Sequence, residues 1–336
     1  MKKSKLQQPL NLFLFIYICL LFTPRLAEAQ GGLSNLELEL NRLGKLSGGT
    51  MGVGVIHIES GRRLYINNGE SYPMASTYKV PIAVQLLKRV QMNEITLNQM
   101  VEVQTYDLHP GSGTLSRLFI NPGVVLSVRN LLELMMLISD NSATDIMLET
   151  AGGSKRLNMT LKKNRISGMR VDRSTVQLIA DWVGVDISGG KQFSNEDFIK
   201  KYESLSEEEI ESANRAFSRD LRDTSTPEAM ALLLEKIWKK EILTPKLSEL
   251  LLDIMGRCKT GEGRLKGMLP EETFVAHKTG TIGTTTNDIG IIELPQKKGH
   301  VVVVAFVKDS VLEIPEREKA IAHVARAAHD YFLFNQ

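Results

Sequence analysis

The strand-like segments of this sequence lie at its two ends, and the helix-like segments lie between them. Near the N-terminus, Gly52–Ile58 and Arg63–Ile66 are β-prone runs on either side of Glu59-Ser60-Gly61, which predicts a hairpin. Near the C-terminus, three further runs predict an antiparallel meander: Thr273–Lys278, Asp288–Leu294 and His300–Val307. A sheet assembled from both ends of the chain leaves the middle as a helical insertion.

Helical patterns flank this sheet and fill the middle of the chain. Leu33–Leu46 is amphipathic and ends at a Ser-Gly-Gly stop signal, and a C-terminal helix is predicted from about Pro315 to Phe332. The middle holds four further runs: Val128–Ile138, Asn141–Glu149, Thr226–Trp238 and Leu247–Met255. We therefore predict an α/β (α+β) fold, in which an antiparallel sheet built from both termini is flanked by helices and an all-helical domain is inserted. The α/β part would span about 30–75 and 256–336 and the helical part about 76–255, with the expected site in the cleft between them.

The first 29 residues have the pattern of an export signal. A basic start precedes the apolar run Leu12–Phe22, the helix-breaking Pro24 and then Ala27-Glu28-Ala29, after which signal peptidase would cut. Eleven apolar residues are too few to remain as a membrane span. We expect residues 30–336 to be the mature domain, free of stable membrane insertion and located in the periplasm or outside the cell.

Charge and cysteine content narrow the function further. Four of the 41 basic and one of the 39 acidic residues lie in the leader, which leaves 37 basic and 38 acidic residues in the mature chain. The resulting net charge near −1 argues against nucleic acid as a partner. Cys258 alone remains outside the leader, so no intramolecular disulfide is expected, and we expect this thiol to be a small buried group. The six histidines are scattered, so neither a metal nor another cofactor is expected.

Ser76-Thr-Tyr-Lys79 precedes the apolar run Val80–Val90 and should begin a buried helix. Side chains three residues apart share a helix face, so Lys79 could take the proton of Ser76 if burial or a nearby cation lowers the lysine pKa. Pro81 fits badly unless the helix is kinked or begins late. Taken alone, the four-residue pattern is weak and more often marks an ordinary helix start.

Two other short motifs present polar groups. Ser139-Asp-Asn141 separates two helical runs, where it would expose a hydroxyl and an amide or simply form a helix N-cap. In Lys278-Thr-Gly-Thr281, strand alternation places Thr279 and Thr281 on one face, and Gly280 would let a ligand approach the backbone. A lysine and threonines beside a glycine are suited to binding a carboxylate. Alternatively, this segment is only a solvated strand edge. Alternation puts Lys278 on the opposite face, so its side chain would have to reach around.

In this order, S-x-x-K, S-D-N and K-T-G resemble the signature set of penicillin-recognising serine enzymes. The sequence is most similar to class A β-lactamases and their close penicillin-binding relatives, through Pro73–Lys79, Arg222–Pro227, Lys278–Thr281 and Thr285–Ile289. The resemblance covers the mature chain apart from about residues 182–221. It implies the β-lactamase or transpeptidase-like fold.

The resemblance implies a role for each motif in acylation. Ser76 would be the nucleophile, Lys79 would help to take its proton, and the backbone N–H groups of Ser76 and Thr281 would form the oxyanion hole. Ser139 would pass a proton to the leaving nitrogen, with Lys278 holding that hydroxyl in place.

Other matching residues would bind the substrate. Asn141 would contact the acyl amide, while Lys278 and Thr279 would face the substrate carboxylate beside Gly280 and Thr281. Arg264, fourteen residues before Lys278, either assists carboxylate binding or is a solvated arginine.

The sequence departs from the class A pattern in the Ω-loop. Arg173 and Asp223 match the arginine and aspartate that form a salt bridge at the neck of this loop. Thr175 stands where the family has the glutamate that activates the deacylating water, and Ile179 stands where it has an asparagine. A threonine hydroxyl is not ionised near neutral pH, so we expect acylation to proceed and hydrolysis of the acyl-enzyme to be impaired.

An insertion of about residues 182–221 follows. Ser194–Asp197 and Ser206–Glu209 each fit a capping box and predict two short helices. A replacement base could be Gln177, Asp181, Lys79 acting in both half-reactions, or an acid of the insertion. Those acids would otherwise form the solvated faces of the two helices: Glu196, Glu203, Glu207, Glu208, Glu209 and Glu211.

Three functions are compatible with these residues. The first is a serine β-lactamase that opens β-lactams through an acyl-Ser76 intermediate, with atypical or slow deacylation. The second is a D,D-peptidase acting on D-Ala-D-Ala stem peptides of peptidoglycan. The third is a non-hydrolytic covalent β-lactam binder or sensor. In each case a small molecule or stem peptide is the partner, and a monomer is expected.

Overall fold

A computed structural model describes residues 33–188 and 194–335 of the 336-residue chain. The leader predicted over residues 1–29 and part of the loop predicted at Ser188-Gly-Gly190 lie outside the described residues. Within the described part, no helix is both long and apolar enough to cross a bilayer.

The five-stranded antiparallel sheet is assembled from both ends of the chain, as the sequence predicts. Its strand order is β2-β1-β9-β8-β7, so the N-terminal hairpin pairs with the C-terminal meander along β1 and β9. The strands are β1 (Thr50–His57), β2 (Arg63–Ile66), β7 (Val275–Ile282), β8 (Thr285–Glu293) and β9 (His300–Lys308).

The strands β7 and β8 are longer than the sequence pattern indicates. β7 continues through the whole Lys278–Thr281 motif, and β8 begins at Thr285 rather than at Asp288. The two strands pair across this extension, with Thr281 opposite Thr286. This extension is rich in glycine and threonine, and its sequence alone predicts a strand only weakly. Hydrogen bonds to the paired strand hold it in the extended conformation.

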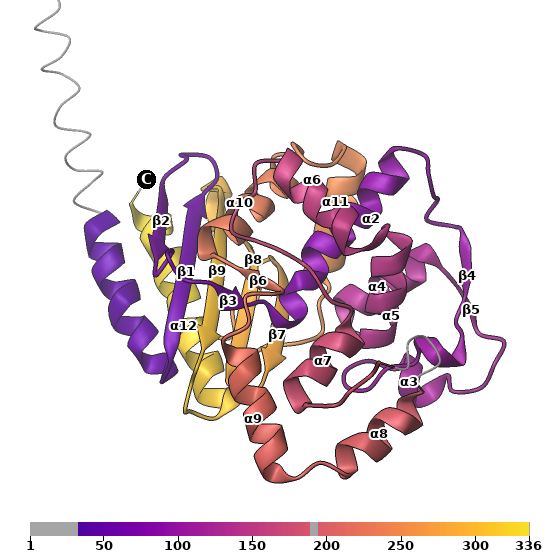
Figure 1. The fold of residues 1–336 in the computed structure, drawn as a ribbon. Helices are drawn as coiled ribbons and strands as arrows, with labels where there is room; N and C mark the ends of the chain where they lie inside the picture. The colour runs from indigo at the N-terminus through magenta and orange to yellow at the C-terminus, as the bar shows by residue number, and fades with distance from the viewer. Residues whose placement is uncertain (1–32, 189–193, 336) are drawn as a thin grey trace, which may run out of the picture.

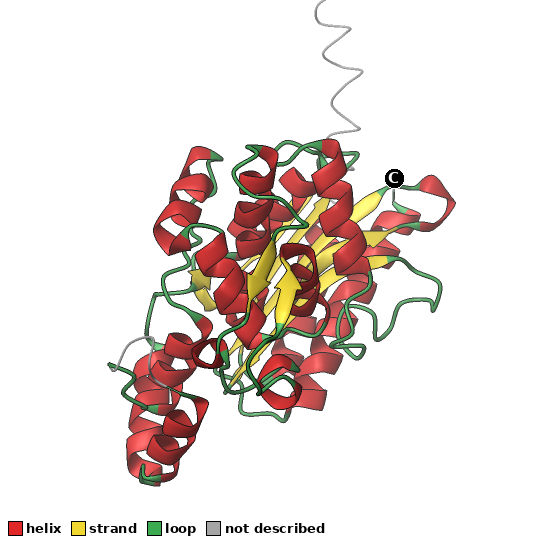
Figure 2. Ribbon diagram, turned by 90° about the vertical axis from the view of Figure 1, so that its right-hand side faces the viewer, coloured by secondary structure: helices red, strands yellow, loops and turns green. Residues whose placement is uncertain are grey.

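Helices cover both faces of the sheet, which explains why β9 is buried almost along its whole length (Figure 1). The helix over residues 33–44 and α12 (Ile314–Phe334) pack on one face, and α10 (Pro227–Trp238) packs on the other against β1 and β9. Figure 2 shows the strands enclosed between helices in a second view. A sheet covered on both faces needs continuous rather than alternating hydrophobic strands, as in Val301–Val307.

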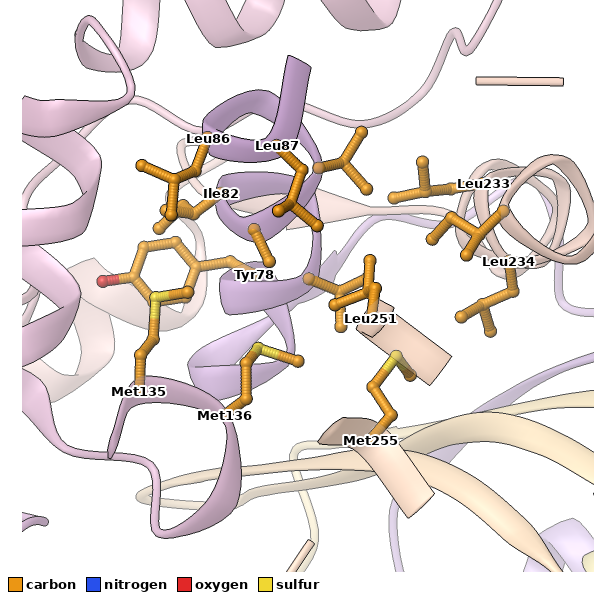
Figure 3. Close-up of a cluster of buried hydrophobic side chains, with 14 of the residues drawn as sticks. Tyr78, Ile82, Leu86, Leu87, Met135, Met136, Leu233, Leu234, Leu251 and Met255 are labelled. Atoms are coloured by element: carbon orange, nitrogen blue, oxygen red, sulfur yellow. The ribbon is translucent and has the colours of Figure 1, made fainter. Parts of the chain in front are cut away.

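The helical part surrounds α2 (Lys79–Gln91), whose first nine residues are all buried. Figure 3 shows Tyr78, Ile82, Leu86 and Leu87 surrounded by side chains of α4, α10 and α11. Apart from Lys79 and Gln85 these nine residues are apolar on every side of the helix, which is typical of a helix inside the molecule. The other helices of this part are α3 (Leu115–Leu118), α4 (Val128–Leu137), α5 (Asn141–Thr150), α6 (Gly153–Lys163) and α11 (Pro245–Gly256). Cys258, at the end of this part, is a free and buried thiol, as expected.

Two small strand pairs lie outside the five-stranded sheet. β3 (Tyr72–Pro73) pairs with β6 (Thr224–Ser225), next to the serine of the first motif, and β4 (Met100–Glu102) pairs with β5 (Val125–Ser127) at the far edge of the helical part.

The predicted insertion contains two helices, as its capping boxes indicate. Ser194 caps α8 (Asn195–Glu203) and Ser206 caps α9 (Glu207–Ser218), and both capping boxes are formed. Both helices lie with α7 (Thr175–Val183) along the lower edge of the molecule in Figure 1. A small apolar cluster of α7 and α8 side chains joins them to the body.

The helix over residues 33–44 offers a matched test of the packing. Leu40 is 0% exposed and Leu38 is 70% exposed. We expect Leu40→Ala to lower the free energy of unfolding by about 2–5 kcal/mol, because it leaves a cavity beneath the sheet, and Leu38→Ala to change it by no more than about 0.5 kcal/mol. Chemical denaturation of both variants measures this difference. Equal losses would show that this helix does not pack as described.

Candidate active site

Ser76 lies on a tight turn that opens towards a pocket. The 3-10 turn Ala75–Tyr78 precedes α2, and Ala75 has a left-handed backbone with φ of 46°. Such φ values are unfavourable for non-glycine residues and are tolerated where the surrounding structure imposes them. Ser76 is half-buried, lines a pocket of about 240 Å³, and its hydroxyl makes no hydrogen bond with any residue that the structure describes.

Pro81 is accommodated because the α-helix begins late. Lys79 is the first α-helical residue, so Pro81 occupies the third position of the first turn. Backbone N–H groups in the first turn lack partners within the helix, and a proline there costs no helical hydrogen bond. The kink that the sequence left open is not needed.

Lys79 is completely buried between the turn and the Ser139 loop. Its Nζ lies 2.7 Å from the carbonyl oxygen of Ser139, 3.0 Å from Ser139 Oγ and 3.0 Å from Asn141 Oδ1. Burial, reinforced by the nearby charge of Lys278, holds the pKa of Lys79 well below its ordinary value. A lysine in this environment can be neutral and can accept a proton.

Ser139 connects the two lysines of the motifs. Its backbone is left-handed, with φ of 60°, and its Oγ lies 3.0 Å from Lys79 Nζ and 3.1 Å from Lys278 Nζ. Lys278 does reach around from its strand: its ammonium is buried and also donates to the Thr279 carbonyl at 3.0 Å. Burial lowers the pKa of Lys278 to about 8. The hydroxyl is therefore placed to relay protons between two amines.

In Ser139-Asp-Asn141 the middle residue forms the helix N-cap, and the two outer residues supply the hydroxyl and the amide of the site. Asp140 is the N-cap of α5 and accepts a hydrogen bond from the Ala143 N–H at 2.9 Å. Its other oxygen accepts from the Thr114 and Leu115 N–H groups, which fastens the neighbouring loop. The flanking Ser139 and Asn141 are left to face the lysines.

Ser112 belongs to this cluster but was not predicted from the sequence. Its Oγ lies 2.8 Å from the Ser139 carbonyl and 3.1 Å from Asn141 Oδ1, while Asn141 Nδ2 donates to the Pro110 carbonyl at 2.9 Å. The Pro110-Gly-Ser-Gly113 segment signals a loop in the sequence, but nothing local shows that this loop returns to the motif. A side chain on Gly113 would collide with Asp140.

Gly280 has a role that the sequence did not indicate. A Cβ at this position would lie 2.6 Å from the Met74 carbonyl oxygen and 2.9 Å from the Ser76 nitrogen. The glycine therefore allows the turn that carries Ser76 to approach β7 closely, while the approach of a ligand to this backbone stays a prediction. β7 therefore runs directly past the turn, with Thr281 next to Ser76 along the pocket wall.

Arg264 is buried, so the solvated alternative is wrong. Its guanidinium donates to the Gly280 and Asn287 carbonyls at 3.1 and 2.8 Å and to Thr281 Oγ1 at 2.6 Å. Glu318 of α12 pairs with it at 2.9 Å. Arg264 thus places a cation directly behind Thr281, while Thr279 Oγ1 is held 2.6 Å from Thr260 Oγ1.

The two residues predicted at the loop neck meet in the structure. Arg173 Nε lies 2.5 Å from Asp223 Oδ2, and both residues are buried. Burial raises the pKa of Asp223 even though Arg173 and two backbone N–H groups bind the carboxylate. Arg173 also pairs with Asp181 at 2.8 Å and with Asp220 at 3.1 Å, so one guanidinium ties both ends of the inserted segment together.

Thr175, the first residue of α7, lies in the Ser76 pocket and is buried. Its Oγ1 lies 2.5 Å from the hydroxyl of Tyr78, whose pKa burial raises well above the ordinary value. Asp145 binds the Thr175 and Val176 N–H groups and so fixes the start of the helix. No carboxylate is among the described residues that line this pocket: Ala75, Ser76, Tyr78, Gly111, Ser112, Asn141, Thr175, Leu178, Ile179, Trp182, Thr281 and Ile282.

The proposed substitutes for the missing glutamate do not line this pocket. Gln177 Nε2 donates to Asp181 Oδ1 at 2.6 Å, and Asp181 is occupied by Arg173 and Arg222. All six glutamates of the insertion are exposed on α8 and α9, which confirms the solvated alternative. Of the candidate bases, Lys79 alone belongs to the cluster around Ser139.

Comparisons with known proteins agree with this geometry. Residues 35–332 match the family described as Beta-lactamase enzyme family. The chain is 28% identical to Beta-lactamase VEB-1 of Pseudomonas aeruginosa over 95% of this chain and 97% of that protein.

Solved structures give the same result. The TLA-1 extended-spectrum β-lactamase superposes with a TM-score of 0.74 at 28% identity, over 90% of this chain and 99% of that one. A variant of PBP-A was solved as an acyl-enzyme complex with penicillin G. It superposes with a TM-score of 0.70 at 26% identity, over 89% of this chain and 97% of that one. The chain therefore belongs to the β-lactamase enzyme family, as a divergent class A-like serine hydrolase.

Proposed function

We propose that this protein is an exported β-lactamase that opens β-lactam rings through an acyl-enzyme on Ser76 and deacylates slowly. The observation that carries the proposal is the position of Ser139 Oγ, within 3.1 Å of two buried amines whose pKa values are both lowered. The N-terminal 29 residues would be the export signal, and the remainder would fold as the sheet part with the inserted helical part.

Acylation would use the two lysines in turn. Neutral Lys79 takes the proton of Ser76 as Oγ attacks the β-lactam carbonyl carbon. The N–H groups of Ser76 and Thr281, which Gly280 allows to come close, stabilise the negative charge on the carbonyl oxygen. As the C–N bond breaks, Ser139 donates its proton to the leaving nitrogen and recovers one from the Lys79 ammonium, which returns to its neutral form.

The substrate carboxylate would lie along β7. Lys278 and Thr279 face it directly, and Arg264 adds positive charge behind Thr281. β7 is an edge strand of the five-stranded sheet, so an extended, peptide-like substrate could lie along its outer edge.

Deacylation would be the difficult step. In class A enzymes the glutamate deprotonates the attacking water, whereas here Thr175 and Tyr78 offer two neutral hydroxyls. Hydroxyls can orient a water molecule but cannot act as a base near neutral pH. Lys79 would then serve both half-reactions.

A D,D-peptidase is the second candidate, and the missing carboxylate together with the position of β7 at the edge of the sheet favours it. Release of D-alanine from a D-Ala-D-Ala peptide would distinguish the peptidase. An adduct that never turns over, with either substrate, would indicate a covalent binder or sensor.

The nucleophile assignment is tested first. We expect Ser76→Ala to abolish labelling by a fluorescent penicillin, a loss of at least about 10³-fold, because the substitution removes the oxygen that forms the proposed ester. Ser204→Ala, on the exposed insertion, is the control and should label normally. Labelling of the Ser76→Ala protein would refute the assignment. Intact-mass spectrometry of the wild type then follows the adduct: loss within seconds supports a β-lactamase, and persistence for hours supports the peptidase or binder.

The lysine pKa values predict the pH dependence of acylation. The rate should rise with pH as Lys79 loses its proton, and it should fall above about pH 8 as Lys278 loses the charge that binds the carboxylate. An arginine stays charged over this range, so Lys278→Arg should shift the alkaline limb upward even if the maximal rate drops. Stopped-flow acylation between pH 5 and 10 measures both limbs. An unchanged alkaline limb would exclude Lys278 as its source.

Restoring a carboxylate tests the deacylation argument. We expect Thr175→Glu to accelerate hydrolysis of the acyl-enzyme by about 10²–10⁴-fold, the usual contribution of a positioned general base. Thr175→Gln has similar size without the base and should give no gain. If both variants fold and neither deacylates faster, position 175 does not face the acyl carbonyl.

A further inference from the structure

The indole of Trp182 lies between two hollows. One is the pocket that contains Ser76, and the other is a neighbouring hollow of about 190 Å³ below the β7–β8 turn. Trp182 and Ile282 line both of them. The far side of the second hollow is formed by α9, through Asn214 and Phe217. The inserted segment therefore borders the same depression as the nucleophile.

Trp182 is held in place by hydrogen bonds from the insertion. Its Nε1 donates to Asn214 Oδ1 at 2.8 Å, and Asn214 Nδ2 donates back to the Trp182 carbonyl at 3.0 Å and to the Ile210 carbonyl at 2.8 Å. On its other side the indole abuts the β7–β8 turn, where a Cβ on Gly283 would lie 3.0 Å from Nε1. The ring is thus clamped between α9 and the sheet.

The helix that carries Asn214 is itself anchored to the loop neck. The Phe217 ring lies 5.2 Å from the Arg173 guanidinium, and Asp220 pairs with Arg173 at 3.1 Å. Arg173 is the residue that also binds Asp223. The inserted helix is therefore a fixed wall, because its position is determined by the same buried arginine as the neck.

The chemistry of the Ser76 pocket separates its two ends. Cationic groups for the carboxylate lie along β7, at Lys278 and behind Thr281. Beyond Thr281 the lining becomes apolar, with Ile282 at the end of β7 and Leu178, Ile179 and Trp182 on α7. A β-lactam bound by its carboxylate at the first end would direct its acyl side chain into the second.

We propose that Trp182 is a specificity-determining residue that closes the acyl-side-chain end of the site, and that Asn214 of the insertion is its positioning residue. The pocket would accept a flat aromatic side chain, which can stack against the indole, and would exclude bulky branched ones. This inference rests on the proposed acylation of Ser76.

The test compares acylation rates with three penicillins: the nucleus without an acyl side chain, one with a benzyl side chain, and one with a bulky, branched aryl side chain. We expect Trp182→Ala to raise the rate with the bulky compound and to lower the rate with the benzyl compound, each by about tenfold, within the range that pocket shape provides. The rate with the bare nucleus should stay within about twofold, because the nucleus does not reach the indole.

Asn214 variants separate positioning from general stability. Asn214→Ala should change the relative acylation rates with the bulky and benzyl penicillins in the same direction as Trp182→Ala, by a smaller factor. Asn214→Asp keeps the acceptor for the indole N–H and should restore part of the wild-type preference. Glu208→Ala, at an exposed position on the same helix, is the matched control and should match the wild type.

A second readout does not depend on removing the indole. The chain has two tryptophans, so Trp238→Phe leaves Trp182 as the sole indole fluorophore. Acylation by the benzyl compound should then change the emission, and acylation by the bare nucleus should not.

The outcomes are distinguishable. If Trp182→Ala lowers the acylation rate by the same factor with all three penicillins, the role of Trp182 is overturned. The same holds if the variant keeps the wild-type preference among the penicillins and acylation leaves the fluorescence emission of the Trp238→Phe protein unchanged. Failure of the wild type to form an adduct with any of the three would instead refute the proposed function.

Discussion

Two buried lysine amino groups organise this molecule. Lys79 and Lys278 are withdrawn from water, and such groups are tolerated only where oxygen atoms replace the lost hydration. Ser139 supplies its hydroxyl to both lysines and its carbonyl to Lys79, while Asn141 and the Thr279 carbonyl complete the set. The hydrogen bonds of these two amino groups fasten α2, the α4–α5 junction and β7 to one another. The same burial lowers both pKa values, so one constraint provides the architecture and the reactivity.

The sheet contributes by pressing its last strand against the turn that carries Ser76. Gly280 removes the side chain that would block this approach. Asn287, one strand further in, donates to the Pro73 and Met74 carbonyls at 2.8 and 3.0 Å and accepts from the Val307 N–H. These contacts join three strands to the turn. The left-handed backbone of Ala75 is held by this framework rather than by local preference.

The Ω region combines a retained scaffold with altered chemistry. The Arg173–Asp223 pair closes the neck, and α7 brings Thr175 to the pocket in place of a carboxylate. The insertion adds α8 and α9, whose acids face solvent while Asn214 and Phe217 face inward. In our proposals these changes act on different steps, since the lost base affects deacylation and the added wall affects the choice of acyl side chain.

The sequence by itself determined the sheet from both termini, the order of the three motifs, the two capped helices of the insertion and the residues of the loop neck. The first three rest on short-range periodicity, on capping chemistry or on motifs whose order along the chain is informative, and the loop-neck residues rest on the family resemblance. Only the tertiary structure decided that Arg264 is buried against Glu318, that Ser112 joins the cluster and that Asn214 holds Trp182. It also brings Lys278 to Ser139, a contact that strand alternation argued against and that only the family resemblance implied. These contacts join residues from 27 positions apart, for Ser112 and Ser139, to 139 positions apart, for Lys278 and Ser139, and packing of separate elements, rather than local preference, brings them together.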